Sequence, residues 1–222
     1  KLVINMTECL KHRGPDGKGF LRFKNVSMGH RRLAIQDIKG GAQPFEIEEY
    51  AIIFNGEIYN HLELRKKYLP DIRFRSNSDT ETLLYLIVKF KEKAFQLLDG
   101  MFALCILDKK NNKLLLARDR AGKKPLYFYF KNQKFIFASE LNTLTKAVGN
   151  FEVNDDAINC YLRCGFIHDI NSPYKYIKQV RPGELILIDI ESLKTKHELY
   201  YDILDFYQNK SQANTKEIIK NI

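Results

Sequence analysis

The stretch Asn55-Gly56-Glu57-Ile58-Tyr59-Asn60 carries residue types that can do polar chemistry, and it directly follows the apolar run of residues 51–54. An Asn-Gly pair at a strand end places a side-chain amide beside a free backbone N–H, and polar chemistry collects at such ends. Two such donors can stabilise an oxyanion. Taken alone, Asn-Gly after a strand also suits a plain turn. The rest of the chain has to decide between the two interpretations.

The four cysteines, Cys9, Cys105, Cys160 and Cys164, have neither disulfide-framework nor zinc spacing, so we expect no metal site. Cys160 and Cys164 are four residues apart on a helix-like segment and share a face. Without a second ligand pair, core packing is the favoured explanation for both. Cys105 lies in an apolar run that indicates a buried strand. Four unpaired cysteines suit the reducing cytoplasm.

Composition places the chain among ordinary soluble proteins. It has 222 residues, 45% of them hydrophobic, and a formal net charge of +9. No apolar run approaches the ~18 residues of a membrane span. The Lys and Arg residues are spread along the chain in pairs, so we expect no specific nucleic-acid binding despite the basic charge. The sequence starts in mid-pattern without Met, and we expect the natural beginning of the protein to lie outside it.

Several elements must position the Asn55-Gly56 pair. Residues 2–10 resemble the end of a helix, and residues 19–24 and 26–33 form a predicted hairpin. The apolar run of residues 51–54 predicts a strand, followed by a helix from 57 to about 69. Ser78 with a Glu three residues later is a capping-box pattern, which predicts a helix over residues 79–90.

The second half of the chain predicts mostly strands. Residues 101–108, 114–118, 126–130 and 134–138 indicate four successive antiparallel strands. Short helices are expected at 141–146 and 155–163, and a strand at 184–190 with a hairpin partner at 197–201. The polar stretch 208–214 indicates a linker, and 216–222 the start of a further helix. This pattern predicts an α+β layered domain with a central two-sheet core.

Several short blocks with polar and glycine residues follow one another along the chain: His12-Arg13-Gly14-Pro15-Asp16, Gly29-His30-Arg31-Arg32-Leu33, Asn55-Gly56-Glu57-Ile58-Tyr59-Asn60, Ser78-Asp79-Thr80-Glu81, Asp99-Gly100-Met101-Phe102-Ala103 and Ala117-Arg118-Asp119-Arg120-Ala121-Gly122-Lys123-Lys124-Pro125-Leu126-Tyr127, with Phe137-Ala138-Ser139-Glu140 and Arg181-Pro182-Gly183 in support. In their order and approximate spacing, these six or more blocks resemble the glutaminase half of glutamine-hydrolysing asparagine synthetase over about residues 5–205.

The resemblance implies a class II glutamine amidotransferase with an N-terminal-nucleophile (Ntn-hydrolase) fold, a four-layer αββα sandwich. Residues 1–205 would form this domain, and 206–222 a linker and the start of an absent C-terminal synthetase domain. In the family, glutamine is hydrolysed to glutamate, and the ammonia amidates aspartate in the second domain with ATP and Mg²⁺. The glutaminase domain itself needs no cofactor. A homodimer stays open.

The resemblance also assigns site residues. Asn55 and Gly56 N–H would stabilise the oxyanion, and Arg32 would bind the glutamine α-carboxylate through its planar fork. Asp79 and Glu57 would hold the α-ammonium. The backbone of Leu33 and Ile35 would line the pocket. Each has a simpler rival interpretation, a surface strand residue for Arg32 and a helix-dipole or exposed first-turn acid for the two carboxylates.

Two matters stay open at this stage. The family's nucleophile, a cysteine at the mature N-terminus whose own α-amino group is the base, would precede Lys1, and Cys9 cannot replace it because it is internal. An amidotransferase with a sugar or peptide acceptor, or a non-catalytic binding module, would show the same N-terminal domain.

His12, Arg13 and Asp16 are expected to brace the pocket. His61, His168 and His197 are expected to be structural or exposed.

Overall fold

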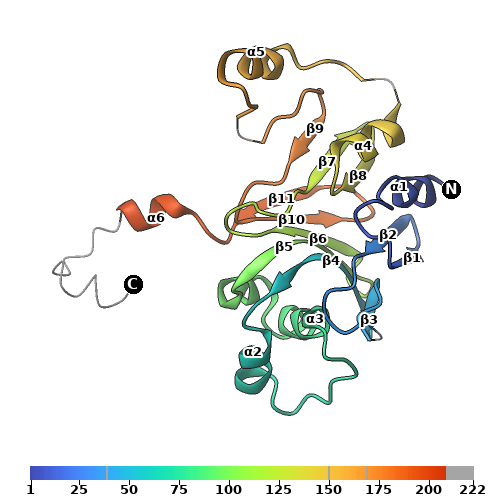
Figure 1. Ribbon diagram of the computed structural model, residues 1–222, viewed down its shortest axis with the longest axis vertical. Coiled ribbons are helices and arrows are strands. Elements are labelled where there is room, and N and C mark those ends of the chain that lie inside the picture. The colour runs from blue at the N-terminus through green and yellow to red at the C-terminus, as the bar shows by residue number, and fades with distance from the viewer. Residues whose placement is uncertain (39, 150, 169, 209–222) are drawn as a thin grey trace.

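We analysed the protein in a computed structural model that describes residues 1–38, 40–149, 151–168 and 170–208 (Figure 1). Most of the predicted linker and the predicted helix start at 216–222 lie outside the described residues. None of the helices in the described part is both long and apolar enough to cross a membrane.

A six-stranded, antiparallel sheet forms the first sheet layer. Its strand order is β11-β10-β6-β5-β4-β3. Helices α2 (His61–Tyr68) and α3 (Asp79–Phe90) and the 3₁₀ helix η1 (Lys91–Leu97) cover one face through an apolar core. The strands are β3 (Phe45–Ile47), β4 (Tyr50–Ile58), β5 (Gly100–Asp108), β6 (Lys113–Arg118), β10 (Glu184–Asp189) and β11 (Thr195–Leu199).

The second sheet layer has two separate parts. One is the hairpin of β1 (Gly17–Phe23) and β2 (Val26–Arg32), and the other is a three-stranded sheet in the order β8-β7-β9. These strands are β7 (Tyr127–Lys131), β8 (Lys134–Ala138) and β9 (Ile177–Gln179). A second apolar core joins both parts to the six-stranded sheet, with Met28, Ile53, Cys105, Leu116 and Phe128 among its members.

Helices also cover the outer side of this second layer. Helix α1 (Leu2–Cys9) packs against β2 and against α4 (Leu141–Val148), which in turn packs against β8. Two further helices, α5 (Asp155–Cys164) and α6 (Ile203–Gln208), follow later in the chain. The order of helices, sheet, sheet and helices confirms the predicted α+β, four-layer αββα architecture (Figure 1).

The prediction that the strand breaks at Asn55-Gly56 is wrong. Strand β4 runs on through Asn55 and Gly56 to Ile58, paired residue for residue with β5, and α2 begins only at His61. Ile58 is fully buried. Burial of this apolar side chain and continued pairing along β5 therefore outweigh the turn preference of Asn-Gly.

The four strands predicted after residue 100 do not form one succession. β5 and β6 belong to the six-stranded sheet, whereas β7 and β8 lie in the second layer. The chain changes layer at Asp119, whose carboxylate accepts backbone N–H groups of Ala121, Lys123 and Lys124 at 2.9–3.1 Å. These local bonds close a loop that turns the chain out of the first sheet.

Two smaller expectations also need correction. The capping box is only half formed: Ser78 Oγ accepts the Thr80 N–H, but Glu81 turns back to Arg75 and Ser76 instead of to Ser78 N. Cys160 and Cys164 are not core residues, because Cys164 is exposed and Cys160 is only half-buried.

Candidate active site

A cavity of about 1210 Å³ opens between the two sheet layers. Its walls come from α1, β2, β4, β5, β8 and the N-terminal end of α3. The seven site residues predicted from the resemblance all line it: Arg32, Leu33, Ile35, Asn55, Gly56, Glu57 and Asp79. Segments far apart in sequence thus converge on one space.

Strand β4 offers a row of backbone N–H groups on the side away from β5. β3 pairs with β4 only as far as Ile52. Beyond that point, Phe54 N–H donates to Gln43 Oε1 at 2.6 Å, and Ile58 N–H donates to Asp79 Oδ2 at 2.9 Å. N–H groups two residues apart on a strand point the same way. The N–H of Gly56, which lies between them, therefore points to this open side.

The pairing with β5 supports this orientation. Gly56 is opposite Phe102, but Phe102 N–H donates to Asp119 Oδ2 and Phe102 O accepts Asp119 N–H, so both groups face β6. Gly56 and Phe102 therefore form a non-hydrogen-bonded pair. Among the described residues, Gly56 N–H has no hydrogen-bond partner.

The side chain of Asn55 supplies a second donor beside Gly56. Alternation along β4 puts Asn55 on the same face as Ile53, which packs in the core between the two sheets. Its amide makes no hydrogen bond to any described residue, and it lines the cavity. The two donors predicted for an oxyanion are thus adjacent, and both are available.

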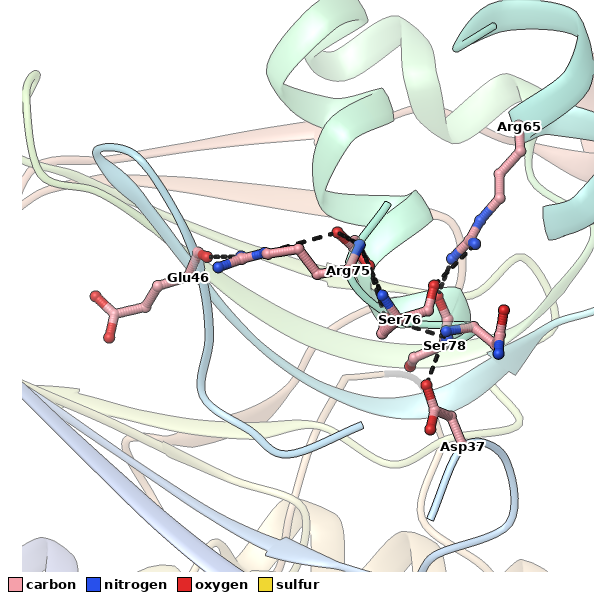
Figure 2. Close-up of polar contacts among 8 residues, drawn as sticks. Asp37, Glu46, Arg65, Arg75, Ser76 and Ser78 are labelled. Carbon is pink, nitrogen blue, oxygen red and sulfur yellow. Dashed lines mark hydrogen bonds and ion pairs between the residues drawn. The ribbon is translucent and has the colours of Figure 1, made fainter. Parts of the chain in front are cut away.

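Asp79 is the first residue of α3 and is only 5% exposed. The segment before it is fixed from two sides (Figure 2): Arg65 donates to Ser76 O and Ser78 O, while Asp37 accepts the N–H of Asn77 at 2.7 Å. The fully buried Glu81 accepts the N–H groups of Arg75 and Ser76. This network positions the Asp79 carboxylate without using its own oxygens.

The electrostatics around Asp79 suit a cationic ligand. Burial raises the pKa of Asp79 above its usual value, the neighbouring Glu57 raises it further, and the N–H of Ile58 opposes the shift. Asp79 Oδ2 accepts the Ile58 N–H, whereas Oδ1 has a long contact of 3.5 Å to Ser78 Oγ, and the Thr80 N–H also acts to lower the pKa. Two neighbouring acidic groups of which one keeps a weakly bonded oxygen attract an ammonium group.

The guanidinium of Arg32 is largely engaged with the loop that follows it. Nη1 donates to Ile38 O at 2.8 Å, and Nη2 donates to Gln36 O and Asp37 O at 2.9 and 2.7 Å. Gln36 in turn donates to Glu57 Oε1 at 2.8 Å. Arg32 therefore shapes this loop, and of the five guanidinium N–H groups two are left for a ligand.

Leu33 and Ile35 sit on the same loop with exposed side chains, 56% and 69% accessible. Asp16 accepts the N–H of Ala34 at 2.8 Å, while His12 and Arg13 contact Glu140. The structure thus places Asp16 as a brace of the loop, and His12 and Arg13 at a contact with the segment before α4.

Two residues at the cavity were not predicted as site residues. His30 faces Phe54 O, to which Nε2 donates at 3.2 Å, and its buried Nδ1 has no partner among the described residues. Burial lowers the pKa of His30 to about 4, which keeps the ring neutral. Gln43 occupies the Phe54 N–H. His30 could have been predicted, because it belongs to the block Gly29-His30-Arg31-Arg32-Leu33 that carries the resemblance. Nothing in the sequence marks Gln43 as a site residue.

Of the three histidines expected to be structural or exposed, His61 is buried, His197 is paired and His168 is exposed. His61 is 8% exposed, and burial lowers its pKa, while nearby Asp79 opposes the shift. His197 lies 2.9 Å from Glu184 Oε1. Neither His61 nor His197 lines the cavity.

Comparison with known proteins was made for sequence and for fold. Residues 1–201 match the family described as "Glutamine amidotransferase domain". The chain is 39% identical over 191 residues to asparagine synthetase [glutamine-hydrolyzing] 1 of Bacillus subtilis, covering 85% of this chain and 30% of that protein. It is 34% identical to putative asparagine synthetase [glutamine-hydrolyzing] 2 of Methanocaldococcus jannaschii, covering 92% and 44%. The chain therefore spans less than half the length of these relatives.

A solved structure shares the fold. The glutamine phosphoribosylpyrophosphate amidotransferase of B. subtilis superposes with a TM-score of 0.67 at 21% sequence identity, covering 90% of this chain and 46% of that one. At this identity the likeness concerns the fold alone.

Proposed function

The chain belongs to the family of glutamine amidotransferase domains, and from this membership we propose that it hydrolyses the side-chain amide of glutamine to glutamate and ammonia. The observation that carries the proposal is the donor pair on β4. Gly56 N–H and the Asn55 amide are adjacent, unpartnered among the described residues and at the wall of the same cavity. Preorganised donors of this kind stabilise a tetrahedral oxyanion.

We propose that the nucleophile is the N-terminal cysteine of the family, and that it would act from this cavity, beside Asn55 and Gly56. Two features support this assignment. The volume of about 1210 Å³ exceeds the ~300–1,000 Å³ of ordinary small-molecule sites. Among the described residues, β2 pairs only with β1 and β8 only with β7, and residues of both strands line the cavity, so it is bordered by two strands that each lack a second partner.

The reaction then follows from the chemistry of an N-terminal cysteine. Its α-amino group, with a pKa of ~8 when unperturbed, takes the thiol proton. The thiolate sulfur adds to the amide carbon of glutamine, and Asn55 and Gly56 N–H bind the resulting oxyanion. The α-ammonium returns the proton to the departing nitrogen, and ammonia leaves. Water hydrolyses the thioester, which releases glutamate and restores the thiol.

The remaining side chains recognise the amino-acid end of glutamine. Asp79, through its Oδ1, and Glu57 would bind the α-ammonium. Arg32 would bind the α-carboxylate through the two guanidinium N–H groups that are not bonded to the loop carbonyls. The backbone of Leu33 and Ile35 would close the pocket on the solvent side.

For the whole protein we propose the amidation of aspartate to asparagine. The names of relatives that this chain matches at 39% and 34% identity support that acceptor. ATP and Mg²⁺ would be needed in the synthetase part and not in this domain. We place the enzyme in the cytoplasm, where its free cysteines would stay reduced.

The full-length protein with a free N-terminal cysteine tests this function by glutamate release from glutamine. We expect Asn55→Ala to lower kcat by about 10²–10³ with an unchanged fold, because one oxyanion donor is lost. Asn142→Ala, an exposed asparagine on α4, is the matched control and should retain full turnover. A wild-type turnover rate in Asn55→Ala would refute the donor assignment. No glutamate from the full-length protein would refute the function.

A further inference from the structure

Helix α5 and the loop after it carry a second group of reactive side chains. Helix α5 lies at the end of the molecule remote from α2 and α3 (Figure 1), and its residues do not line the cavity. Among the described residues, Cys160, Cys164 and His168 form a cluster in which Sγ, Sγ and one ring nitrogen all lie within 4.8 Å of one another. The proposed glutaminase reaction uses none of them.

Local geometry explains how this cluster forms. Cys160 and Cys164 are one helical turn apart and share a face of α5. The helix ends at Gly165, which adopts the left-handed conformation (φ 78°, ψ 0°) and donates its N–H to Tyr161 O. This cap reverses the chain, so that His168 comes back against the same face.

We propose that Cys160, Cys164 and His168 bind a thiophilic divalent cation, Zn²⁺ in the first place, with water as the fourth ligand. Zinc is held by Cys Sγ at ~2.3 Å and His nitrogen at ~2.0–2.1 Å in a tetrahedron, so its ligand atoms are about 3.5–3.8 Å apart. A present separation of at most 4.8 Å closes to that value by small side-chain rotations. Cys164 and His168 are exposed, which leaves the fourth position open to solvent.

Neither core packing nor a disulfide accounts for the two cysteines. Core packing fails because Cys164 is exposed. A disulfide fails because side chains four apart on a helix have Cβ atoms about 5–6 Å apart, whereas a disulfide needs about 3.5–4.5 Å. The cluster also lies at the C-terminal end of α5, where the helix dipole favours a cation.

The expected role is to tie the chain after α5. Cys160 Sγ now has only a weak contact of 3.6 Å to Phe166 O, in the loop that leads towards β9. A cation would replace this contact with bonds from α5 to His168 and so fix the loop against the helix.

Cobalt serves as the spectroscopic probe in the reduced, metal-stripped full-length protein. We expect one Co²⁺ per chain, with thiolate-to-cobalt charge transfer and the intense visible bands of four-coordinate cobalt, and displacement by one equivalent of Zn²⁺. Losing an outer-shell partner already weakens metal binding about 10–100-fold. Cys164→Ser and His168→Ala should therefore each raise the Kd for Zn²⁺ by at least that factor.

Cys9→Ser is the matched control, since Cys9 lies on α1, outside the cluster, and it should leave both the bands and the Kd unchanged. Glutamine turnover and circular dichroism of each variant report on folding. The proposal is overturned if cobalt shows no thiolate charge transfer, or if its bands persist in Cys164→Ser. Bands lost in Cys9→Ser but kept in His168→Ala would equally place the metal elsewhere.

Discussion

At the scale of single residues, Asp79 shows how one carboxylate can serve both the fold and a ligand. Oδ2 receives the N–H of Ile58, which ties α3 to β4. Oδ1 has a long contact of 3.5 Å to Ser78 Oγ, and Asp79 lines the cavity together with Glu57. Burying the Asp79 carboxylate without a cationic partner costs free energy, and binding of a substrate ammonium group would offset that cost.

Asp79→Asn should separate these two roles. Because the pKa of Asp79 is raised in the folded state, its stabilising effect is present at low pH and is lost as pH rises through that pKa. At neutral pH, the free energy of unfolding of Asp79→Asn should therefore be at least as large as that of the wild type. Its KM for glutamine should rise about tenfold or more, since a charge-assisted bond is lost.

Steady-state kinetics and urea unfolding at neutral pH measure both effects. Asp155→Asn is the control, because Asp155 is likewise the first residue of its helix, α5, and does not line the cavity. A wild-type KM in Asp79→Asn would show that Asp79 does not bind the substrate.

The sequence predicted some residues of the site and missed others for physical reasons. Asn55, Gly56 and Asp79 were predicted because they lie in short blocks that resemble a known family, and all three line the cavity. Gln43 acts by capping one backbone N–H across a loop, and nothing local in the sequence marks such a contact. Arg32 lines the cavity, but its bonds to three loop carbonyls could not be predicted, because they depend on how that loop folds back.

At the scale of elements, β4 is the strand on which the site depends. Periodicity identified its apolar half, residues 51–54, but not its continuation. A turn and a strand were both compatible with Asn55-Gly56, and only the partner strand β5 decides between them. Pairing between distant segments is invisible to local patterns.

Gly56→Ala should disrupt β4 where it carries the donors. A Cβ at position 56 would lie 2.2 Å from Met101 O and 2.7 Å from Phe102 Cα, both backbone atoms of β5. We expect a loss of about 1–3 kcal/mol in the free energy of unfolding. Turnover should also fall at least about 100-fold, because the displaced N–H no longer meets the oxyanion.

Gly17→Ala is the matched control for this substitution. Gly17 is also a strand glycine, but its added Cβ would meet only Arg32 Cβ, at an ordinary 3.6 Å. Denaturant midpoints of both variants measure the predicted loss of stability, and their kcat values measure the predicted loss of turnover. Equal stability of the two variants would contradict the close packing of β4 on β5.

At the scale of the whole molecule, the two-sheet core was predictable and the division of the second layer was not. Alternating and continuous apolar runs indicate which strands are buried. They do not say that β7 leaves the first sheet, because that depends on the bonds Asp119 makes to the loop after it. Nor do they indicate that β2 and β8, each with one partner strand among the described residues, both line one cavity.

The neutral state of His30 between the sheets makes stability of the whole fold depend on pH. The pKa of His30 is lowered from 6.5 to about 4, because burial favours the neutral ring. The contribution of this neutral ring to the free energy of unfolding is therefore present above pH ~6.5 and is lost as the pH falls towards 4. The full shift corresponds to at most about 3–4 kcal/mol. His30→Gln should flatten this fall, since Gln carries no titrating charge.

Unfolding free energies measured by urea titration at several pH values between 4 and 7 check this expectation. His12→Gln, which alters an exposed histidine paired with Glu140, should leave the fall in place. An identical slope in wild type and His30→Gln would assign the acid sensitivity to other groups.

The alternation of β4 has a consequence for how this sequence can change. Phe54, Gly56 and Ile58 direct their N–H groups to one side, and Gln43 and Asp79 occupy the first and last of them. Inserting or deleting a single residue in β4 ahead of Gly56 would turn that N–H towards β5 and move Asn55 to the opposite face. A substitution in β4 that spares Asn55 and Gly56 leaves this alternation in place, whereas a change in the length of the strand would abolish the donor pair even in a protein that still folds.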